Sequence, residues 1–198
     1  MTEWWTYRLS SFLMFSPRTY WRLVESYNRD IWPAPVVAAG AGLVLLWLTA
    51  VPRPGGGRIV AAILAVAWLW VGWAFHWQRY ATINWAAGYF AVAFWLQAAL
   101  LVIAGVFRSS DPERVPRARV RNVGLTLAVC GLLLYPLAGL PAGRPWAQAE
   151  VFGVMPEPTA MVTLGLLLAT GQSHTRWLSI VPVLSLAVGM ATLWLISS

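Results

Sequence analysis

The chain has no lysine, one cysteine, two histidines and seven acidic residues among 198. With Cys130 alone no intrachain disulfide can form, which excludes the disulfide scaffold of a small secreted domain. Charged residues make up 11% of the chain, against roughly 25% in a soluble domain. Together with 59% hydrophobic residues, this scarcity of charge excludes an ordinary soluble enzyme and a disordered tail, and it indicates an integral membrane protein.

Arginine and tryptophan, in contrast, are abundant. All 14 basic residues are arginine, the formal net charge is +7, and there are 14 tryptophans. The arginines lie between hydrophobic runs, which favours contact with anionic lipid headgroups over nucleic acid. Indole rings suit the membrane interface, because they bury an apolar ring and keep the N–H hydrated. The tryptophans at or near the ends of the hydrophobic runs are Trp32, Trp77, Trp85, Trp146, Trp177 and Trp194.

The hydrophobic runs predict an all-α bundle of six transmembrane helices in one domain, residues 33–198. A spanning helix needs about 20 mostly apolar residues, and its backbone must be hydrogen-bonded within the segment. Turn-forming residues such as the 52–57 stretch, which contains two prolines and three glycines, separate the runs. The predicted spans are residues 33–51, 58–77, 85–107, 122–140, 146–171 and 177–196.

Residues 1–32 form a separate amphipathic segment. Ser16 followed by Pro17 is typical of an N-cap and a first helical residue, which predicts a helix over residues 17–28. One face of this helix would be apolar and the other arginine-rich, as in a helix that lies in the membrane interface. Packing across the end of the bundle is equally compatible with the pattern. The apolar face is formed by Tyr20, Leu23, Val24 and Tyr27.

The fifth run contains the acidic residue best placed for a function. Glu157 lies between Pro156 and Pro158, and each proline disfavours a continuous helix. We expect two half-helices, one ending near Met155 and one beginning at about residues 158–159, where Thr159 would cap the second. Broken helices at membrane depth often form ion or substrate sites. The alternative is a plain kink near the interface, with Glu157 reaching the headgroups.

Three further polar residues, His76, Asn84 and Gln97, lie in or beside the second and third spans. They would line the same site as secondary groups, because polar side chains in spans are rare. His76 could also be a haem or metal ligand or a packed interfacial histidine, and Gln97 an interhelical hydrogen bond. The sequence has no Cys/His cluster with metal spacing, no nucleophile elbow and no phosphate loop, so we expect no metal site and no catalytic residues. It does not indicate a cofactor.

Several stretches make the chain resemble uncharacterised bacterial multipass membrane proteins that are grouped as a domain of unknown function. The resemblance covers nearly the whole chain and implies a six-span protein of the bacterial inner (plasma) membrane, without an activity. The matching stretches are residues 4–7, 12–23, 80–87, 97–98, 152–159 and 163–165.

Two functions follow as expectations. The first is a small transporter or channel for an ion or polar solute, with its site at the broken fifth helix. The second is a non-catalytic accessory subunit of a larger membrane complex, in which tryptophan-rich faces would be docking surfaces. At 21.9 kDa one copy is small for a transporter, so we also expect a homo-oligomer or a subunit of a complex.

Overall fold

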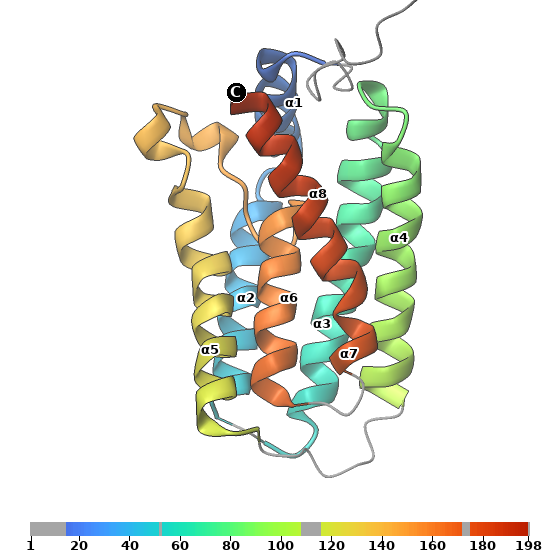
Figure 1. Cartoon of the computed structure of the whole chain (residues 1–198), viewed down its shortest axis with the longest axis vertical. Helices are drawn as coiled ribbons and strands as arrows, with labels where there is room; N and C mark the ends of the chain where they lie inside the picture. The colour runs from blue at the N-terminus through green and yellow to red at the C-terminus, as the bar shows by residue number, and fades with distance from the viewer. Residues whose placement is uncertain (1–14, 52, 108–115, 172–174, 198) are drawn as a thin grey trace, which may run out of the picture.

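The computed structural model describes residues 15–51, 53–107, 116–171 and 175–197, and these ranges contain helices and no strands (Figure 1). The all-α prediction is confirmed for this part of the chain. Three of the long helices continue into π-helical turns: η3 (Val71–Trp77) after α3, η5 (Leu101–Phe107) after α4 and η6 (Cys130–Leu134) after α5. The α-helices are α1 (Pro17–Asp30), α2 (Ala34–Ala50), α3 (Gly56–Trp70), α4 (Ala87–Leu100), α5 (Ala118–Val129), α6 (Pro156–Thr170), α7 (Thr175–Leu178) and α8 (Ile180–Ser197).

Four helical stretches in the described ranges are long and apolar enough to cross a membrane. They are Gly56–Thr82, Ala87–Phe107, Ala118–Ala142 and Thr175–Leu195. A fifth is obtained if α1 and α2, which meet at a bend of 84°, are counted as one broken span. On their own, α2 has 17 residues and α6 has 15. Six spans therefore stay a prediction, whereas several membrane-compatible helices are observed.

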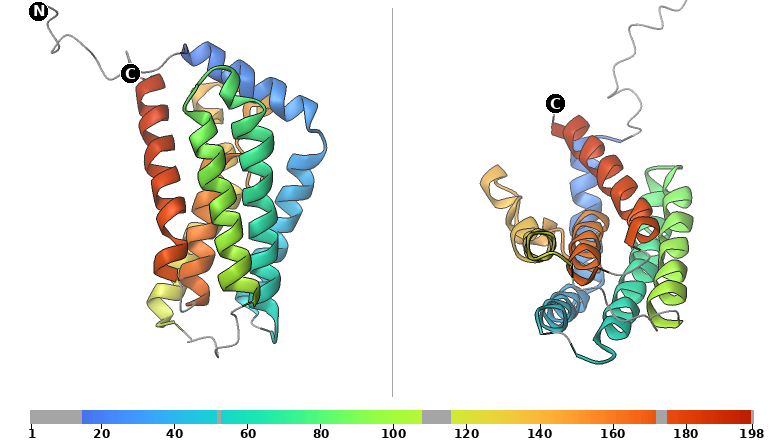
Figure 2. Two further views of the ribbon diagram at one scale, coloured as in Figure 1. Left: turned by 90° about the vertical axis from the view of Figure 1, so that its right-hand side faces the viewer. Right: turned by 60° about the horizontal axis from the view of Figure 1, so that its bottom comes forward.

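The amphipathic helix predicted near the N-terminus is present as α1. The Ser16 hydroxyl accepts a hydrogen bond from the Thr19 amide at 3.2 Å, and Pro17 is the first helical residue. Tyr20, Val24 and Tyr27 are buried. The helix α1 lies across the long helices at one end of the molecule, as Figure 2 shows. Packing of α1 against the bundle end is thus observed, and the first 14 residues lie outside the described part of the chain.

The helix α6 contacts α2, α3, α5 and α8 and occupies the centre of the bundle, as the right-hand view in Figure 2 shows. Two glycines, Gly124 of α5 and Gly165 of α6, let these helices touch through their backbones. A Cβ on Gly165 would lie 2.5 Å from the Ala128 amide nitrogen. The Trp68 indole of α3 donates a buried hydrogen bond to the Thr163 hydroxyl of α6 at 2.9 Å. Both contacts are typical of helix packing in membrane proteins.

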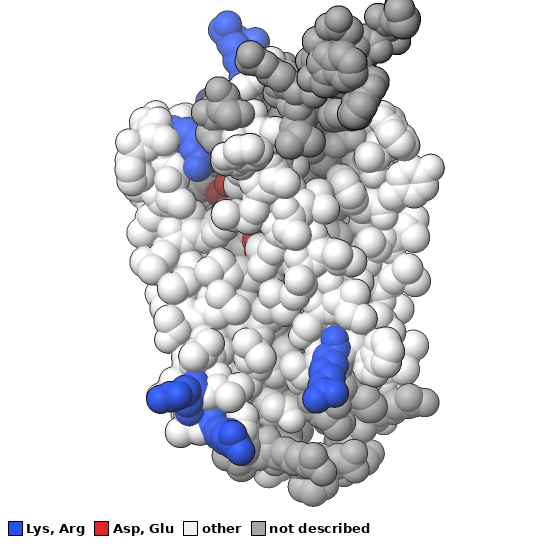
Figure 3. Space-filling model, viewed as in Figure 1, with Lys and Arg blue, Asp and Glu red and all other residues white. Residues whose placement is uncertain are grey.

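Charged and aromatic side chains are distributed as in a membrane protein. In Figure 3 the arginines gather at the two ends of the face, and the belt between them is almost free of charge. The six tryptophans predicted at span ends are all exposed, by 51% to 71%. The distribution matches headgroup contact at two levels with an apolar zone between them.

The predicted proline-broken fifth span is wrong in one respect. There is no half-helix before Met155: a short 3-10 turn (Trp146–Gln148) leads into residues 149–155, which contain no helix. A single helix, α6, then begins at Pro156. The two prolines are tolerated because the amides of a first helical turn have no partner within the helix, so their loss costs little there. The prolines begin the helix instead of interrupting it.

Candidate functional site

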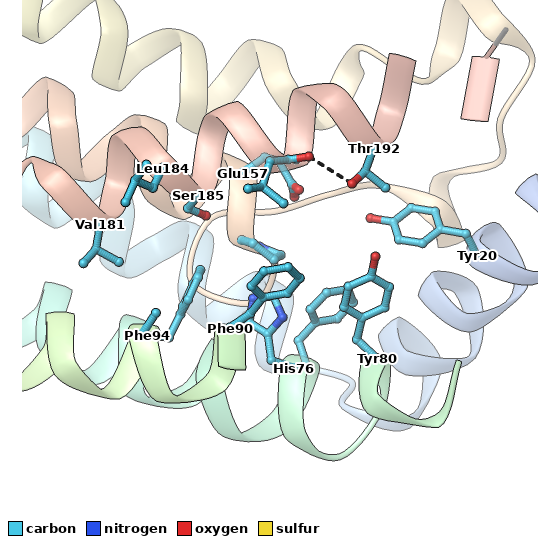
Figure 4. Close-up of a pocket in the computed structure, with 15 residues that line it drawn as sticks. Tyr20, His76, Tyr80, Phe90, Phe94, Glu157, Val181, Leu184, Ser185 and Thr192 are labelled. Atoms are coloured by element: carbon cyan, nitrogen blue, oxygen red, sulfur yellow. Dashed lines mark hydrogen bonds between the residues drawn. The ribbon is translucent and has the colours of Figure 1, made fainter. Parts of the chain in front are cut away.

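A cavity of about 300 Å³ lies beside the N-terminal end of α6 and is lined by residues of α1, η3, α4, α6 and α8 and of the short segment after η3 (Figure 4). Most of its wall is aromatic or aliphatic, and the ionisable side chains that line it are a carboxyl, an imidazole and two phenols. The aromatic wall consists of Tyr20, Phe75, Tyr80, Phe90 and Phe94. The helix α8 contributes Val181, Leu184, Ser185, Val188, Gly189 and Thr192. The remaining residues are His76, Ala93, Pro156 and Glu157.

Glu157, the main candidate from the sequence, lies on this cavity in the first turn of α6. Its side chain is only 6% exposed and packs against Gly189 of α8, where a Cβ would overlap the carboxyl. The Oε2 atom has no hydrogen-bond partner among the described residues, and none of the ion pairs found there includes Glu157. An unpaired buried carboxylate is costly, so this carboxyl is stable either as the neutral acid or with a cation beside it. The N-terminal end of α6 adds a weak attraction for negative charge.

His76 lies on the same cavity, although 80 residues separate it from Glu157 in the sequence. It is buried, and neither of its ring nitrogens has a partner among the described residues. The imidazole is surrounded by aromatic rings instead: its centroid lies 4.6 Å from that of Phe94, 5.3 Å from Phe75 and 5.7 Å from Phe90. Packing holds the ring in place without using its polar atoms. Both nitrogens remain available to a bound molecule.

The π-helical turn η3 is what places His76 there. In this turn the Gln78 amide donates to the Trp73 carbonyl, five residues earlier, at 3.0 Å. The wider turn brings both Phe75 and His76 into the protein, and the two are buried. Single π-helical turns inside α-helices are frequent at functional sites.

A second acid, Glu150, lies in the non-helical segment before α6, outside the candidate spans. It is buried and forms an ion pair with Arg144 at 3.7 Å, and the Arg144 guanidinium also lies 3.9 Å from the Trp21 ring centroid. Burial raises the pKa of the Glu150 carboxyl to about 7, and the Arg144 guanidinium partly opposes this. Figure 3 shows small patches of acidic side chains on the upper part of the face, near the arginines.

The other predicted site residues do not line this cavity. The Thr159 hydroxyl accepts from the Gly153 amide at 2.8 Å and donates to the Met155 carbonyl at 2.6 Å. It therefore ties the non-helical segment to the start of α6, and it is not an N-cap as expected, since Met155 occupies the N-cap position. Pro158 is buried in the same turn.

Gln97 and Asn84 have local structural partners. The Gln97 amide group is fully buried and donates to the Leu178 carbonyl at 2.9 Å, which joins α4 to α7 as an interhelical hydrogen bond. The Asn84 side chain accepts from the Ala86 amide at 3.0 Å and stabilises the turn before α4. The structure thus brings His76, Pro156 and Glu157 together and leaves these two residues elsewhere.

Sequence reasoning missed the contribution of α8. Ser185, Gly189 and Thr192 lie on one face of this helix at i, i+4 and i+7, and all three line the cavity. The Thr192 hydroxyl donates to the Val188 carbonyl at 2.9 Å, the dashed line in Figure 4. A small and polar face on an otherwise apolar span was the signal available. Tyr20 was recognised as part of the apolar face of α1, but not as a wall of a site.

The described residues include no group of three or more histidine, cysteine or acidic side chains able to hold a metal ion. The site instead combines one carboxyl, one imidazole and an aromatic wall.

The model of a protein family described as a family of unknown function (DUF6064) matches residues 18–197 of the chain. None of the curated proteins and none of the solved structures compared with the chain matches it.

Proposed function

The chain belongs to the DUF6064 family, whose description gives no activity, and we propose from its residues that it is a membrane carrier or channel for a small cationic solute. In this proposal α2, α3, α4, α5, α6 and α8 cross the inner membrane of a bacterium as six spans. The cavity beside α6 is the solute site, and Glu157 is the group that binds the cation or its proton.

One observation supports this proposal above the others. Glu157 and His76 come from distant parts of the sequence, both are buried, both line the same cavity, and both have polar atoms without partners among the described residues. Buried polar groups are almost always hydrogen-bonded, and those that are not need an explanation. Ionisable groups inside membrane helices are expensive and are typical of ion or substrate pathways. A bound solute that carries positive charge would satisfy both groups at once.

The start of α6 at this position also supports a site. Helix ends at membrane depth are found where they are buried in protein or line a cavity, and transporters use such ends to bind ions and solutes. Glu157 lies in the first turn of α6, and the non-helical segment before it is held by Thr159. In this proposal the proline pair contributes to the site because it begins a helix there.

Flux measurements test the proposal. Purified protein in proteoliposomes should carry at least one of four probe cations, H⁺, Na⁺, Rb⁺ or methylammonium, faster than protein-free liposomes do. Glu157→Gln should reduce that flux by about tenfold or more, because the carboxylate charge is lost at similar volume. Glu25→Gln is the matched control, since Glu25 lies on α1 in an ion pair with Arg29 at 2.6 Å. Absence of flux for all four probes, or equal flux in Glu157→Gln, would overturn the proposal.

The alternative of an accessory subunit makes a different prediction. The helix α8 carries exposed apolar side chains along its outer face, among them Val183 and Met190. Such a face fits lipid as well as a protein partner. Purification in a mild detergent followed by mass measurement distinguishes a carrier from an accessory subunit, because an accessory subunit would co-purify with larger proteins at fixed stoichiometry.

A further inference from the structure

We infer that the cavity binds a protonated alkylamine, that is, an ammonium group with N–H donors attached to a compact apolar body. This inference rests on the proposed function and names the chemical class of the solute. It distinguishes the amine from a bare metal ion, from a quaternary ammonium without N–H groups, and from a neutral apolar molecule.

The size of the cavity favours a molecule over a bare ion. Its volume is about 300 Å³, whereas a water molecule takes about 30 Å³ in the liquid. An alkali ion would leave most of this space to be filled by water, and the wall offers few groups to hold that water in place. An amine with a compact hydrocarbon body fills more of this space, and does so with apolar surface.

The cavity wall carries too little negative charge for a hard metal ion. Calcium takes six to eight oxygen ligands, and magnesium demands an octahedron of oxygens. The wall has one carboxylate, Glu157, and its other side-chain oxygens are the uncharged hydroxyls of Tyr20, Tyr80, Ser185 and Thr192. Among the described residues there is no group of three or more histidine, cysteine or acidic side chains that could hold a metal ion.

The aromatic wall supplies a different attraction for positive charge. Phe75, Tyr80, Phe90 and Phe94 border the cavity, and a cation placed over such rings is stabilised by their quadrupoles, most strongly where water is excluded. The same rings give apolar contact to the hydrocarbon part of an amine. A single carboxylate beside aromatic rings is therefore complementary to one positive charge on an apolar body.

The unpartnered polar atoms account for the N–H groups. The Glu157 Oε2 atom can accept one hydrogen bond, and a neutral imidazole has one nitrogen that accepts. Both residues line the cavity, and among the described residues no donor reaches Oε2 or either imidazole nitrogen. The N–H groups of an ammonium can donate to these acceptors. A tetraalkylammonium ion has no N–H group and leaves them without a donor, whereas an alcohol of the same shape has one donor and leaves the carboxylate charge uncompensated.

Binding to the purified full chain in detergent tests the inference, by calorimetry at pH 7 with four probes. These are cyclohexylamine, its neutral isostere cyclohexanol, tetramethylammonium chloride and rubidium chloride. We expect cyclohexylamine to bind saturably and the other three at least about tenfold more weakly. Glu157→Gln and His76→Phe should each weaken cyclohexylamine binding, the latter because Phe keeps the ring packing and removes both nitrogens. Glu25→Gln should leave binding unchanged.

Folding of the variants is checked by gel filtration in detergent. Gly189→Ala provides a second route, because it removes no polar atom and pushes a methyl group into the Glu157 carboxyl; it too should weaken cyclohexylamine binding. Equal binding of cyclohexanol or of tetramethylammonium would overturn the inference, since the charge or the N–H groups would then not be recognised. Absence of amine binding together with Glu157-dependent Na⁺, Rb⁺ or H⁺ flux overturns the inference and leaves the proposed function standing. Absence of both overturns both.

Discussion

The Glu157 carboxyl of α6 lies against Gly189 of α8 so closely that a Cβ at position 189 would overlap it. Gly189→Ala should therefore displace the carboxyl and place the new methyl group at the edge of the cavity. We expect at least about a tenfold loss of cation flux in proteoliposomes and a loss of about 1–3 kcal/mol in the free energy of unfolding, as for other overpacked sites. Gly40→Ala in α2 is the control, because a Cβ there meets nothing within 4 Å. Unchanged flux in Gly189→Ala would contradict this contact.

The hydrogen bond from the Trp68 indole to the Thr163 hydroxyl joins α3 to α6 in the middle of the bundle. Thr163→Val keeps the volume of the side chain and leaves the buried indole N–H without its acceptor. The free energy of unfolding should fall by about 1–3 kcal/mol. Unfolding in mixed detergent and SDS micelles, followed by tryptophan fluorescence, measures the change. Thr126→Val on the exposed face of α5 should be nearly neutral; equal effects of the two substitutions would show that the bond contributes nothing.

Much of the fold could be predicted because membrane helices follow directly from length and hydropathy. The stretches 85–107 and 177–196 lie within two residues of the observed Ala87–Phe107 and Thr175–Leu195. The start of α1 was predictable from Ser16 and Pro17, since capping is a local interaction. The fifth span was mispredicted because hydropathy does not distinguish a helix from an apolar segment without helix. Residues 149–155 are held by contacts with distant parts of the chain, such as the Tyr27 hydroxyl bonded to the Val154 carbonyl at 3.2 Å.

The candidate site was predictable only in part, for a related reason. Glu157 and His76 could be selected individually, because an ionisable residue in an apolar run is rare. Their common cavity could not, since it depends on the π-helical turn that places His76 and on the approach of α8 at Gly189. Gln97 was selected by the same rule of rarity and proved to bond a backbone carbonyl. Polarity in a span identifies candidates, and only the packing of the helices decides which of them meet.

The backbone contact between Gly124 and Gly165 leaves no space for a side chain. A Cβ on Gly165 would lie 2.5 Å from the Ala128 amide nitrogen and 2.6 Å from the Gly124 carbonyl oxygen. Because backbone atoms cannot turn aside as a side chain does, Gly165→Ala should separate α5 from α6 and lower the free energy of unfolding by about 2–3 kcal/mol. The comparison is again with Gly40→Ala in the same micelle assay. A neutral Gly165→Ala would mean that the two helices do not meet at this point.

The buried Glu150 carboxyl should make the stability of the protein depend on pH. Its pKa is raised from 4.5 to about 7, chiefly by burial, so between these values the folded chain retains a proton that the unfolded chain releases. The contribution to stability is fully present below about pH 4.5 and is lost as the pH rises through about 7. The glutamine in Glu150→Gln cannot ionise. The fall in the midpoint of unfolding in the micelle assay between pH 5 and pH 8 should therefore be smaller in this variant than in the wild type.

The difference between the two pH profiles reports the ionisation of Glu150 together with its electrostatic interactions with neighbouring groups such as Glu157 and Arg144. Glu25→Gln on α1 tests whether removal of any acid has this effect, and it should keep the wild-type profile. Arg144 remains in Glu150→Gln without its carboxylate partner, and the loss of this ion pair matters only at pH values at which Glu150 is ionised in the wild type. Identical slopes in wild type and Glu150→Gln would mean that Glu150 ionises in the folded protein as it does in water, and that its burial beside Arg144 is fully compensated.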